Sequence, residues 1–476
     1  MLFLVLLVLS GCGEAKAKYV FFFIGDGMGS VQMNAAERYL ASMEGRGGIV
    51  PLAMNLAPVT GSMTTYAKDR YITDSGASGT AIATGMKTSN GTVSMDAEHR
   101  YPLKTIAEIA KEKGRKVGII STVDIDHATP AVFYAHQPRR SSYFDIAKQL
   151  ANSGFDFFAG GDFRQKTDPQ GVDRTGVIEL AKRNGFIHVQ NATAFRYLEP
   201  GAGRVLFIHP DSNEEYAMPY AMDMDAESIT LEQIVRKSIR MLDNPEGFFI
   251  MVEGGKIDWA CHGHDAAACI QEVLALDDAV KAALEFYDKH PKNTLILISA
   301  DHETGGMSLG TSYGDNNVEL SKLQWQTGSF TELTREYRNI RETRIAKYGT
   351  DSVRTGADWA FAFVRNQTGL GDADRGLGMN EHEIKSLRDA YERSFAVRNY
   401  EDPMEYILYG SYDPFMVSVC HMLSRKAGIG WTTFSHTAVP VPVRAFGAGA
   451  EIFDGYYDNT DIFDKLKKVM GSGTKF

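Results

Sequence analysis

Short hydrophobic runs alternate with amphipathic segments along most of the chain. The runs "YVFFFIG", "VGIISTV", "FFIMVEG" and "TLILIS" are nearly free of charged residues, and each leads into a loop rich in Gly or Asp. Continuous apolar runs of this length are typical of strands buried on both faces, and helical segments between them are typical of a parallel sheet. We therefore predict an α/β fold with a central, mostly parallel sheet flanked by helices, and with a largely helical insertion.

The insertion is predicted because the pattern changes between His302 and His436. Three segments carry many charges and have a helical pattern, namely residues 331–348, 380–397 and 405–428. The segment "PVPVRAFG" near the end of the chain again has the pattern of a strand. The expected parts are a leader and short tether (1–18), the first part of the main α/β domain (19–306), an inserted, largely helical cap or subunit contact (307–430) and the return to the main domain (431–476). The role of the insertion stays open.

The charge balance limits the classes of partner. The chain has 476 residues and a formal net charge of −10, with no long run of Lys or Arg. Nucleic-acid-binding proteins usually present a basic face, so we expect no nucleic acid as a specific partner. An anionic substrate must instead be held by local positive charge, such as an arginine or a bound metal ion.

The N-terminal sequence "MLFLVLLVLSGCGEAKAK" predicts export. Its apolar run is too short to span a bilayer as a helix, which needs about 20 residues, but it has the length of a signal-peptide core. The following "LSGC" resembles the lipobox of bacterial lipoproteins, although no Lys or Arg precedes the apolar run. We expect a periplasmic or cell-surface protein whose only membrane contact is a lipid anchor at Cys12.

Three cysteines remain in the body of the protein. Cys261 and Cys269 are eight residues apart in what reads as one helix, a separation of about 12 Å that excludes a disulfide bond. His264 and Asp265 lie between them and are interpreted as part of a solvated helix face. An exported chain without a disulfide framework must be stabilised by its core and by metal ions.

Residues with metal-binding side chains directly follow the predicted strands. Because the carboxyl ends of parallel strands meet at one edge of a sheet, these residues are expected to lie near one another. They are Asp26, Glu253, Asp258, Asp301 and His302, joined by His127 and Thr129 in "HATP" and by His436 in "SHTAV". Asp258 and His262 are spaced i, i+4, so one helix face presents both to a single ion, although surface pairs with this spacing are common.

The stretch "TDSGASGTAIATG" has two interpretations, a flexible linker or a helix start that presents Ser75. In the second interpretation Ser75 lies near a helix N-terminus, where backbone N–H groups and the helix dipole favour an anion. The surrounding "DSGAS" lacks the G-x-S-x-G elbow, and no Ser-His-Asp triad is indicated. A metal ion is therefore the more natural activator of this serine.

Six motifs, in order and with matching spacing, resemble those of the alkaline phosphatase family. They are "FFFIGDGMG", "YITDSGASGTAIATG", "HATPAVFYAHQPRR", "MVEGGKIDWACH", "ISADHETGG" and "SHTAVPVPV". The resemblance covers Tyr19 to Gly306 and resumes near His436. It implies an enzyme that hydrolyses small phosphate monoesters through a phosphoserine intermediate, with two Zn²⁺ and one Mg²⁺, and that forms a homodimer.

The resemblance also assigns a role to each site residue. Ser75 resembles the phosphorylated nucleophile, and Arg140 resembles the phosphate-binding arginine. Arg140 is chosen over Arg139 because it lies thirteen residues after His127, the same spacing as in the family. The metal assignments are Asp258, His262 and His436 for the first zinc, Asp26, Asp301 and His302 for the second, and Asp26, Thr129 and Glu253 for magnesium. The residue types agree, because His and carboxylate ligands suit Zn²⁺ whereas an all-oxygen set suits Mg²⁺.

Two positions depart from one common version of the family. His127 stands where some members carry Asp, and Trp259 stands where some carry Lys. Both are expected to lie beside the third metal or the phosphate, so the identity of the third metal stays open. Two other functions also stay open: a phosphodiesterase of the same superfamily, and a catalytically silent lipoprotein that binds phosphate or metal.

Overall fold

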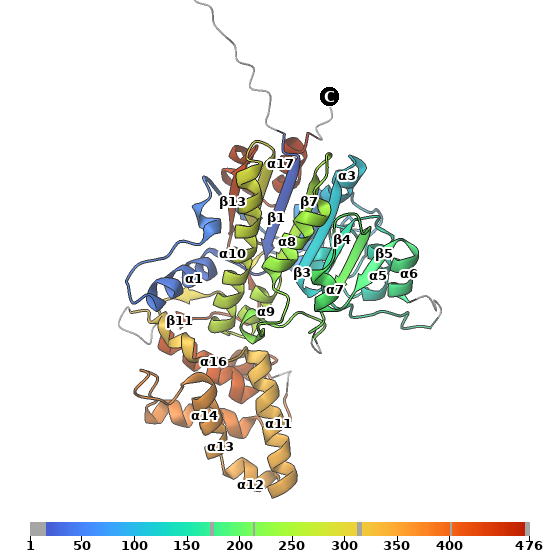
Figure 1. Cartoon of the computed structure of the whole chain (residues 1–476). Helices are drawn as coiled ribbons and strands as arrows, with labels where there is room; N and C mark the ends of the chain where they lie inside the picture. The colour runs from blue at the N-terminus through green and yellow to red at the C-terminus, as the bar shows by residue number, and fades with distance from the viewer. Residues whose placement is uncertain (1–15, 172–175, 213–214, 312–316, 400–401, 472–476) are drawn as a thin grey trace, which may run out of the picture.

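The computed structural model describes residues 16–171, 176–212, 215–311, 317–399 and 402–471 (Figure 1). The strands are β1 (Tyr19–Gly25), β2 (Val59–Thr64), β3 (Lys116–Asp124), β4 (Phe157–Gly161), β5 (Phe186–Val189), β6 (Arg204–Ile208), β7 (Phe248–Gly254), β8 (Thr294–Ser299), β9 (Glu303–Thr304), β10 (Ser308–Leu309), β11 (Ile429–Gly430), β12 (His436–Thr437), β13 (Val441–Gly447) and β14 (Gly455–Asp458). The helices of the main domain are α1 (Ser30–Met43), α2 (Ser75–Thr84), α3 (Ile106–Glu112), α4 (Ala128–Ala131), α5 (Tyr143–Asn152), α6 (Val177–Arg183), α7 (Ala192–Arg196), α8 (Leu231–Leu242), α9 (Lys256–His262), α10 (Ala266–Lys289) and α17 (Asp461–Val469). Those of the insertion are α11 (Phe330–Tyr348), α12 (Thr350–Thr355), α13 (Asp358–Thr368), α14 (Glu381–Arg393), α15 (Pro403–Tyr409) and α16 (Pro414–Ala427).

Ten strands of the described residues form one sheet in the order β14-β2-β13-β8-β1-β7-β3-β4-β6-β5. β1 lies between β7 and β8 and is parallel to both, and all three strands are fully buried. The exception to the parallel arrangement is β13, which is antiparallel to β2 and to β8. The predicted α/β fold with a mostly parallel sheet is confirmed.

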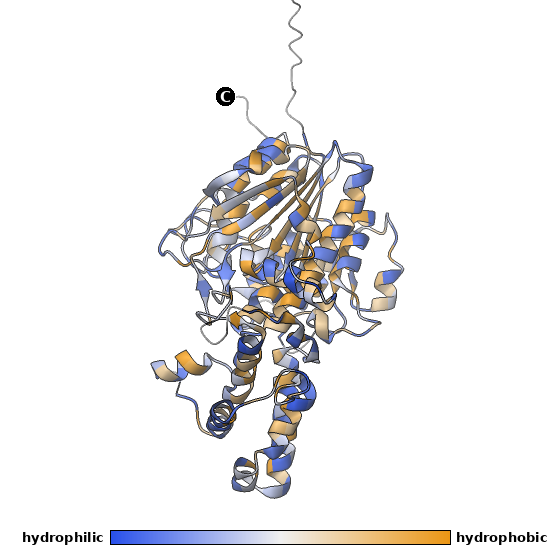
Figure 2. Ribbon diagram, turned by 90° about the vertical axis from the view of Figure 1, so that its left-hand side faces the viewer, coloured by the Kyte–Doolittle hydropathy of each residue, from blue (hydrophilic) through white to orange (hydrophobic). Residues whose placement is uncertain are grey.

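Helices cover both faces of the sheet. α8 and α10 pack on one face, where Figure 1 shows them across the central strands, and α2, α3, α4 and α17 lie on the other. Figure 2 shows that the strands between these layers are predominantly hydrophobic. The main core therefore lies on both sides of the strands that end at the predicted site, which fixes the positions of those ends.

Ala17, two residues before the predicted start of the main domain, is part of the packed fold. Ala17 is fully buried, its N–H donates to Val469 O at 2.9 Å, and its carbonyl accepts from Arg115 at 2.7 Å. Cys12 and the leader lie outside the described residues. Among the described helices, none is both long and apolar enough to span a bilayer.

The insertion is helical and has a hydrophobic core of its own. α11, α13, α14 and α16 pack around Tyr337, Tyr391 and Phe415, with the rings of Tyr337 and Phe415 5.2 Å apart. Figure 1 shows these helices below the sheet, on the side where β1 and β7 end, and β8 ends on this side too because it is parallel to β1. The insertion therefore stands beside the predicted site rather than at the opposite end of the molecule.

The expectation of one continuous helix through Cys261 and Cys269 is wrong. α9 ends at His262, His264 has a positive φ of 53°, and Asp265 caps the next helix by accepting from Ala268 N at 3.0 Å. This turn brings the two thiols to an Sγ–Sγ distance of 3.5 Å, where they are free, buried cysteines. His264 and Asp265 are also buried, so the prediction of a solvated helix face is wrong for the same reason.

Candidate active site

The predicted site residues gather at the carboxyl ends of the central strands. Asp26 follows β1, Glu253 is near the end of β7, and Asp301 and His302 follow β8, with α9 starting directly after β7. The parallel pairing of β1 with β7 and β8 places these three ends at the same level of the sheet. His436 comes from a distant part of the chain and reaches the site through β12, which pairs with β9 opposite Thr304.

The first group consists of Asp258, His262 and His436, whose metal-binding atoms lie within 4.8 Å of one another. The two histidine Nε2 atoms are 3.2 Å apart, and His262 Nε2 is 3.3 Å from Asp258 Oδ2. On the far side of each ring, Nδ1 donates to a backbone carbonyl. His262 Nδ1 donates to Phe434 O at 2.6 Å, and His436 Nδ1 donates to Thr73 O at 2.8 Å. These bonds orient both Nε2 atoms toward the carboxylate of Asp258, as a metal site requires.

The second group consists of Asp26, Asp301 and His302, all of them fully buried. His302 Nε2 lies 3.5 Å from Asp26 Oδ1 and 3.3 Å from Asp301 Oδ2. Its other nitrogen, Nδ1, is 3.2 Å from Thr304 Oγ1, which itself donates to Asp258 at 2.5 Å. Thr304 therefore links the two groups and keeps His302 Nε2 available on the side of the carboxylates.

The third group is formed by Asp26, Glu253 and His127. Thr129 Oγ1 joins it by donating to Asp26 Oδ2 at 3.1 Å, and Ser121 donates to Glu253 at 2.5 Å. His127, which sequence reasoning placed only beside this site, has Nδ1 3.8 Å from Glu253 Oε1. The donor set is therefore three oxygen-bearing side chains with one imidazole in reach.

The electrostatics of these groups favour cations. Burial, reinforced by the carboxylate of Asp301, raises the pKa of Asp26 well above its ordinary value, and burial with the nearby charge of Asp258 raises the pKa of Asp301 to about 8. Buried atoms without a hydrogen-bond partner among the described residues include Asp26 Oδ1, Asp301 Oδ2, Glu253 Oε1 and His127 Nδ1. Leaving so many buried acceptors unpaired is costly unless bound cations satisfy them.

Ser75 is the first residue of α2 and is 2% exposed. Its Oγ lies 3.3 Å from His302 Nε2, which places the hydroxyl beside the second group. Asp74 caps the helix by accepting from Ala77 N at 3.0 Å. Ser75 therefore occupies the N-terminus of a capped helix, where backbone N–H groups and the helix dipole favour a bound anion.

Arg140, rather than the adjacent and exposed Arg139, faces this region. Its Nη1 donates to Asp74 Oδ2 at 2.9 Å and its Nη2 donates to His127 Nε2 at 2.8 Å. Trp259 lies beyond His127, with ring centroids 6.4 Å apart in an edge-to-face contact. Asp74 and His127 thus orient one arginine beside Ser75, and Trp259 borders the histidine.

Sequence reasoning missed Asp74 and Thr304. Asp74 directly precedes Ser75, so its position as a helix cap could have been read from the sequence. Its contact with Arg140 joins residues 66 positions apart and could not. Thr304 lies in the loop after His302, and its link to Asp258 depends equally on tertiary structure.

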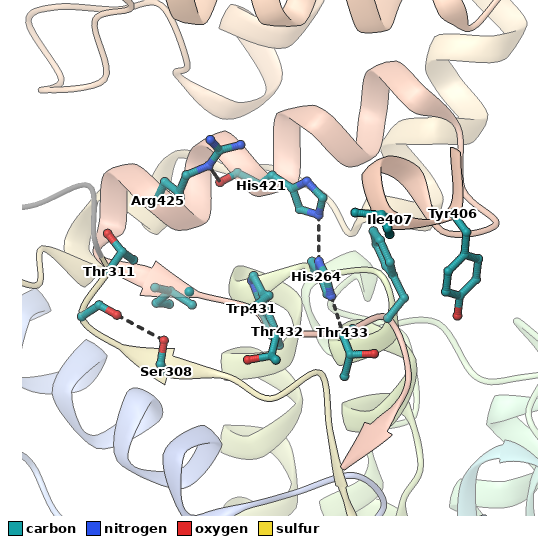
Figure 3. Close-up of a pocket in the computed structure, with 14 residues that line it drawn as sticks. His264, Ser308, Thr311, Tyr406, Ile407, His421, Arg425, Trp431, Thr432 and Thr433 are labelled. Carbon is teal, nitrogen blue, oxygen red and sulfur yellow. Dashed lines mark hydrogen bonds between the residues drawn. The ribbon is translucent and has the colours of Figure 1, made fainter. Parts of the chain in front are cut away.

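A cavity of about 590 Å³ borders the segment that leads to His436, between the main domain and the insertion (Figure 3). Figure 3 shows His264 between His421 and Thr433. His264 Nε2 donates to Thr433 O at 2.8 Å, which makes Nδ1 the acceptor of the neutral ring. His421 Nε2 therefore donates to His264 Nδ1 at 2.7 Å. Burial lowers the pKa of His264 to about 4, so this ring stays neutral near pH 7. Phe434 stacks on the same ring at 4.2 Å, and its carbonyl orients His262. The insertion therefore helps to fix the first group.

The model of the alkaline phosphatase family matches residues 17–472. The chain belongs to the alkaline phosphatase family. It is 30% identical over 466 residues to alkaline phosphatase 3 of Bacillus subtilis (strain 168), covering 96% of this chain and 90% of that protein. The crystal structure of a cold-active alkaline phosphatase from the psychrophile Shewanella sp. matches with a TM-score of 0.75 and 26% identity, over 95% of this chain and 99% of that one. A His-to-Asp mutant of TAB5 alkaline phosphatase, solved with Mg bound in its M3 site, matches with a TM-score of 0.64 and 25% identity, over 97% of this chain and 100% of that one.

The resemblance to the alkaline phosphatase family that the sequence motifs indicated is thus confirmed. The protein is an enzyme, a phosphatase of this family. Its residue groups are candidate metal sites in a family that depends on metal ions. Membership of this family fits the prediction that phosphate monoesters are its substrates.

Proposed function

We propose that the protein hydrolyses phosphate monoesters with two Zn²⁺, one Mg²⁺ and a phosphoserine intermediate on Ser75. The observation that carries the proposal is the position of Ser75 Oγ, 3.3 Å from His302 Nε2 and at the N-terminus of α2. A serine hydroxyl is a weak nucleophile at its ordinary pKa and needs a neighbouring base or cation. The second residue group lies where such a cation would act.

The residues present fit the implied metals. Two imidazoles and one carboxylate in the first group, and two carboxylates and one imidazole in the second, are ligand sets that suit Zn²⁺. The oxygens of Asp26, Glu253 and Thr129 suit Mg²⁺. When bound, such ions stabilise the attacking and leaving oxygens of an in-line displacement and lower the pKa of a coordinated water.

The side chains of this chain perform the remaining tasks. Ser75 attacks phosphorus, forming an O–P bond while the bond to the leaving alcohol breaks, and water later cleaves the phosphoserine to release phosphate. Arg140 binds two phosphate oxygens through the planar guanidinium that Asp74 and His127 hold in place. The N–H groups at the start of α2 add positive potential beside the same oxygens.

The assay that tests the proposed activity compares nitrophenyl phosphate with bis-nitrophenyl phosphate. Because Arg140 and the start of α2 are placed to bind several non-bridging phosphate oxygens, we expect kcat/KM to be at least about a hundredfold higher for the monoester. Initial rates measured with one enzyme preparation give both values. Faster turnover of the diester would show that the protein is a phosphodiesterase.

The third metal depends on His127, and the substitution His127→Asp tests this dependence. A carboxylate in place of the imidazole completes an all-oxygen set, so we expect the Mg²⁺ concentration for half-maximal activation to fall about tenfold or more. In agreement, the TAB5 relative with Mg bound in its M3 site is a His-to-Asp mutant. Mg²⁺ titration of the zinc-loaded enzyme measures the change, with Arg139→Gln as a control on nearby charge. An unchanged Mg²⁺ requirement would place His127 outside the metal site.

The resemblance supports two further proposals. We propose that the protein works as a homodimer, and that it is exported and held at a membrane by a lipid on Cys12. The sequence "LSGC" supports the anchor. Mass spectrometry of the protein from its native membrane fraction would detect the lipid-modified cysteine.

A further inference from the structure

Arg164 follows β4 at the same edge of the sheet as the metal-binding residues. β4 ends at Gly161 and is parallel to β3, which leads to His127. In open α/β sheets the ligand crevice runs along the carboxyl ends of the strands. Because β3 and β4 are parallel neighbours, the edge of the sheet that carries Arg140 and the three groups continues past β3 to the loop that carries Arg164.

One edge of the Arg164 guanidinium is fixed by a buried carboxylate. Nε and Nη2 donate to the two oxygens of Asp124 at 3.0 and 3.1 Å, and Asp124 is fully buried. The backbone N–H of Arg164 also lies 3.2 Å from each carboxylate oxygen of Asp126. Such a bidentate pair holds the plane of an arginine in one orientation.

The opposite edge of the guanidinium is available. Within the described part of the chain, Nη1 of Arg164 makes no hydrogen bond, and the side chain is 30% exposed. The guanidinium carbon lies 5.4 Å from the ring of Tyr143, 6.0 Å from that of Tyr216 and 6.0 Å from that of Trp259. An arginine whose only task was to neutralise Asp124 would not need an exposed edge framed by three aromatic rings.

A short series of contacts connects Arg164 with the phosphate-binding arginine. Trp259 contacts Arg164 on one side and His127 on the other, and His127 accepts from Arg140. Tyr143 is close enough to both arginines for each to lower its pKa against the dominant effect of burial. The two cations thus lie two side chains apart at the same edge of the sheet, in a protein whose formal net charge is −10.

We propose that Arg164 binds a second anionic group of the substrate, several bonds away from the phosphate that is cleaved. This inference rests on the proposed function, because it takes the site at Arg140 and Ser75 as the place of the first phosphate. It gives the enzyme a preference for bisphosphates over monophosphates of the same alcohol. Arg164 supplies the preference through its Nη1 edge, while Asp124 and the aromatic rings keep that edge in position.

Phosphonate binding tests the inference without requiring turnover. Calorimetry on the metal-loaded enzyme compares a homologous series of alkane bisphosphonates with the matching monophosphonates, for the wild type, Arg164→Gln, Arg164→Lys and Arg139→Gln. The wild type should bind the bisphosphonate of matching length about tenfold or more tightly than its monophosphonate, the value expected for a charged hydrogen bond. Arg164→Gln and Arg164→Lys should lose this advantage, and the exposed-arginine control Arg139→Gln should keep it.

Arg164→Lys separates binding from a structural role, because lysine keeps a cation beside Asp124 but has no second edge to offer. The inference is overturned if no bisphosphonate of the series binds more tightly than its monophosphonate, or if the advantage survives in Arg164→Gln. Turnover of nitrophenyl phosphate, measured on the same preparations, reports on the proposed function separately. A bisphosphonate advantage that depends on Arg164 in a protein without monoesterase activity would refute the proposed function and would keep only the anion-binding role of Arg164.

Discussion

Removal of the metal ions with a chelator is expected to lower nitrophenyl phosphate turnover by about a thousandfold or more. Metal ions contribute several kcal/mol of transition-state stabilisation in such sites, and each 1.4 kcal/mol corresponds to about a tenfold change in rate. The reason lies in the three groups, where buried oxygens of Asp26, Asp301 and Glu253 have no hydrogen-bond partner among the described residues. Addition of Zn²⁺ and Mg²⁺ should restore activity, whereas activity that resists chelation would contradict the assignment of these groups as metal sites.

The metal-free protein should also lose stability as the pH rises from about 6.5 to about 8. In the folded apoprotein burial raises the pKa of Asp301 to about 8, and the carboxylate of Asp258 raises the pKa of His262 to about 9 against the effect of burial. Both values exceed those of the unfolded chain, so the folded state binds more protons in this range and is weakened as they leave. Thermal unfolding at several pH values should show this decline without metal and a smaller one with metal.

Ser75→Ala is expected to lower kcat by roughly a thousandfold or more while the protein keeps its bound metals. The substitution removes the attacking oxygen but no residue of the three groups, and loss of a nucleophile commonly costs several orders of magnitude. Turnover and metal content are measured on the same sample. A suitable control is Thr84→Ala, which removes a hydroxyl that donates to Thr80 O at the other end of the same helix.

Two other outcomes for Ser75→Ala are informative. Loss of metal together with activity would mean that the serine supports the metal site rather than attacking the substrate. A protein that keeps wild-type turnover would require another nucleophile, and a wild type without turnover would be the silent metal binder that the sequence left as an alternative.

The sheet and the positions of the strand-end residues could be predicted because they depend on simple geometry. Apolar runs that alternate with helices indicate parallel strands, and parallel strands that end together bring Asp26, Glu253 and Asp301 to one edge. The contacts that orient the site residues could not be predicted in this way. Thr304 contacts Asp258 across 46 residues of sequence, and Asp74 contacts Arg140 across 66. Such contacts depend on loop conformations that leave no periodic signal.

The turn after His262 shows why a local pattern can mislead. The sequence places Cys261 and Cys269 in one predicted helix, yet His264 adopts a positive φ and Asp265 caps the start of a new helix. The turn is stabilised from outside: Gln326 and the N–H of Phe330 both donate to Asp265. A segment of the insertion thus fixes a bend beside the ligand helix. Gly263 at the end of α9 and Asp265 at the start of α10 are the local signal of this bend that the sequence interpretation passed over.

The measurement that tests the central claim most directly is the detection of phosphate on Ser75 during turnover. The metal-loaded enzyme is mixed with a phosphate monoester, quenched in acid and digested, and the peptide that contains Ser75 is analysed by mass spectrometry. The account predicts a phosphorylated Ser75 in the wild type and no phosphorylation of this peptide in Ser75→Ala. Two results would contradict the account. One is an unmodified Ser75 peptide from an active enzyme that is quenched under conditions where the intermediate is hydrolysed slowly. The other is phosphate on a different residue.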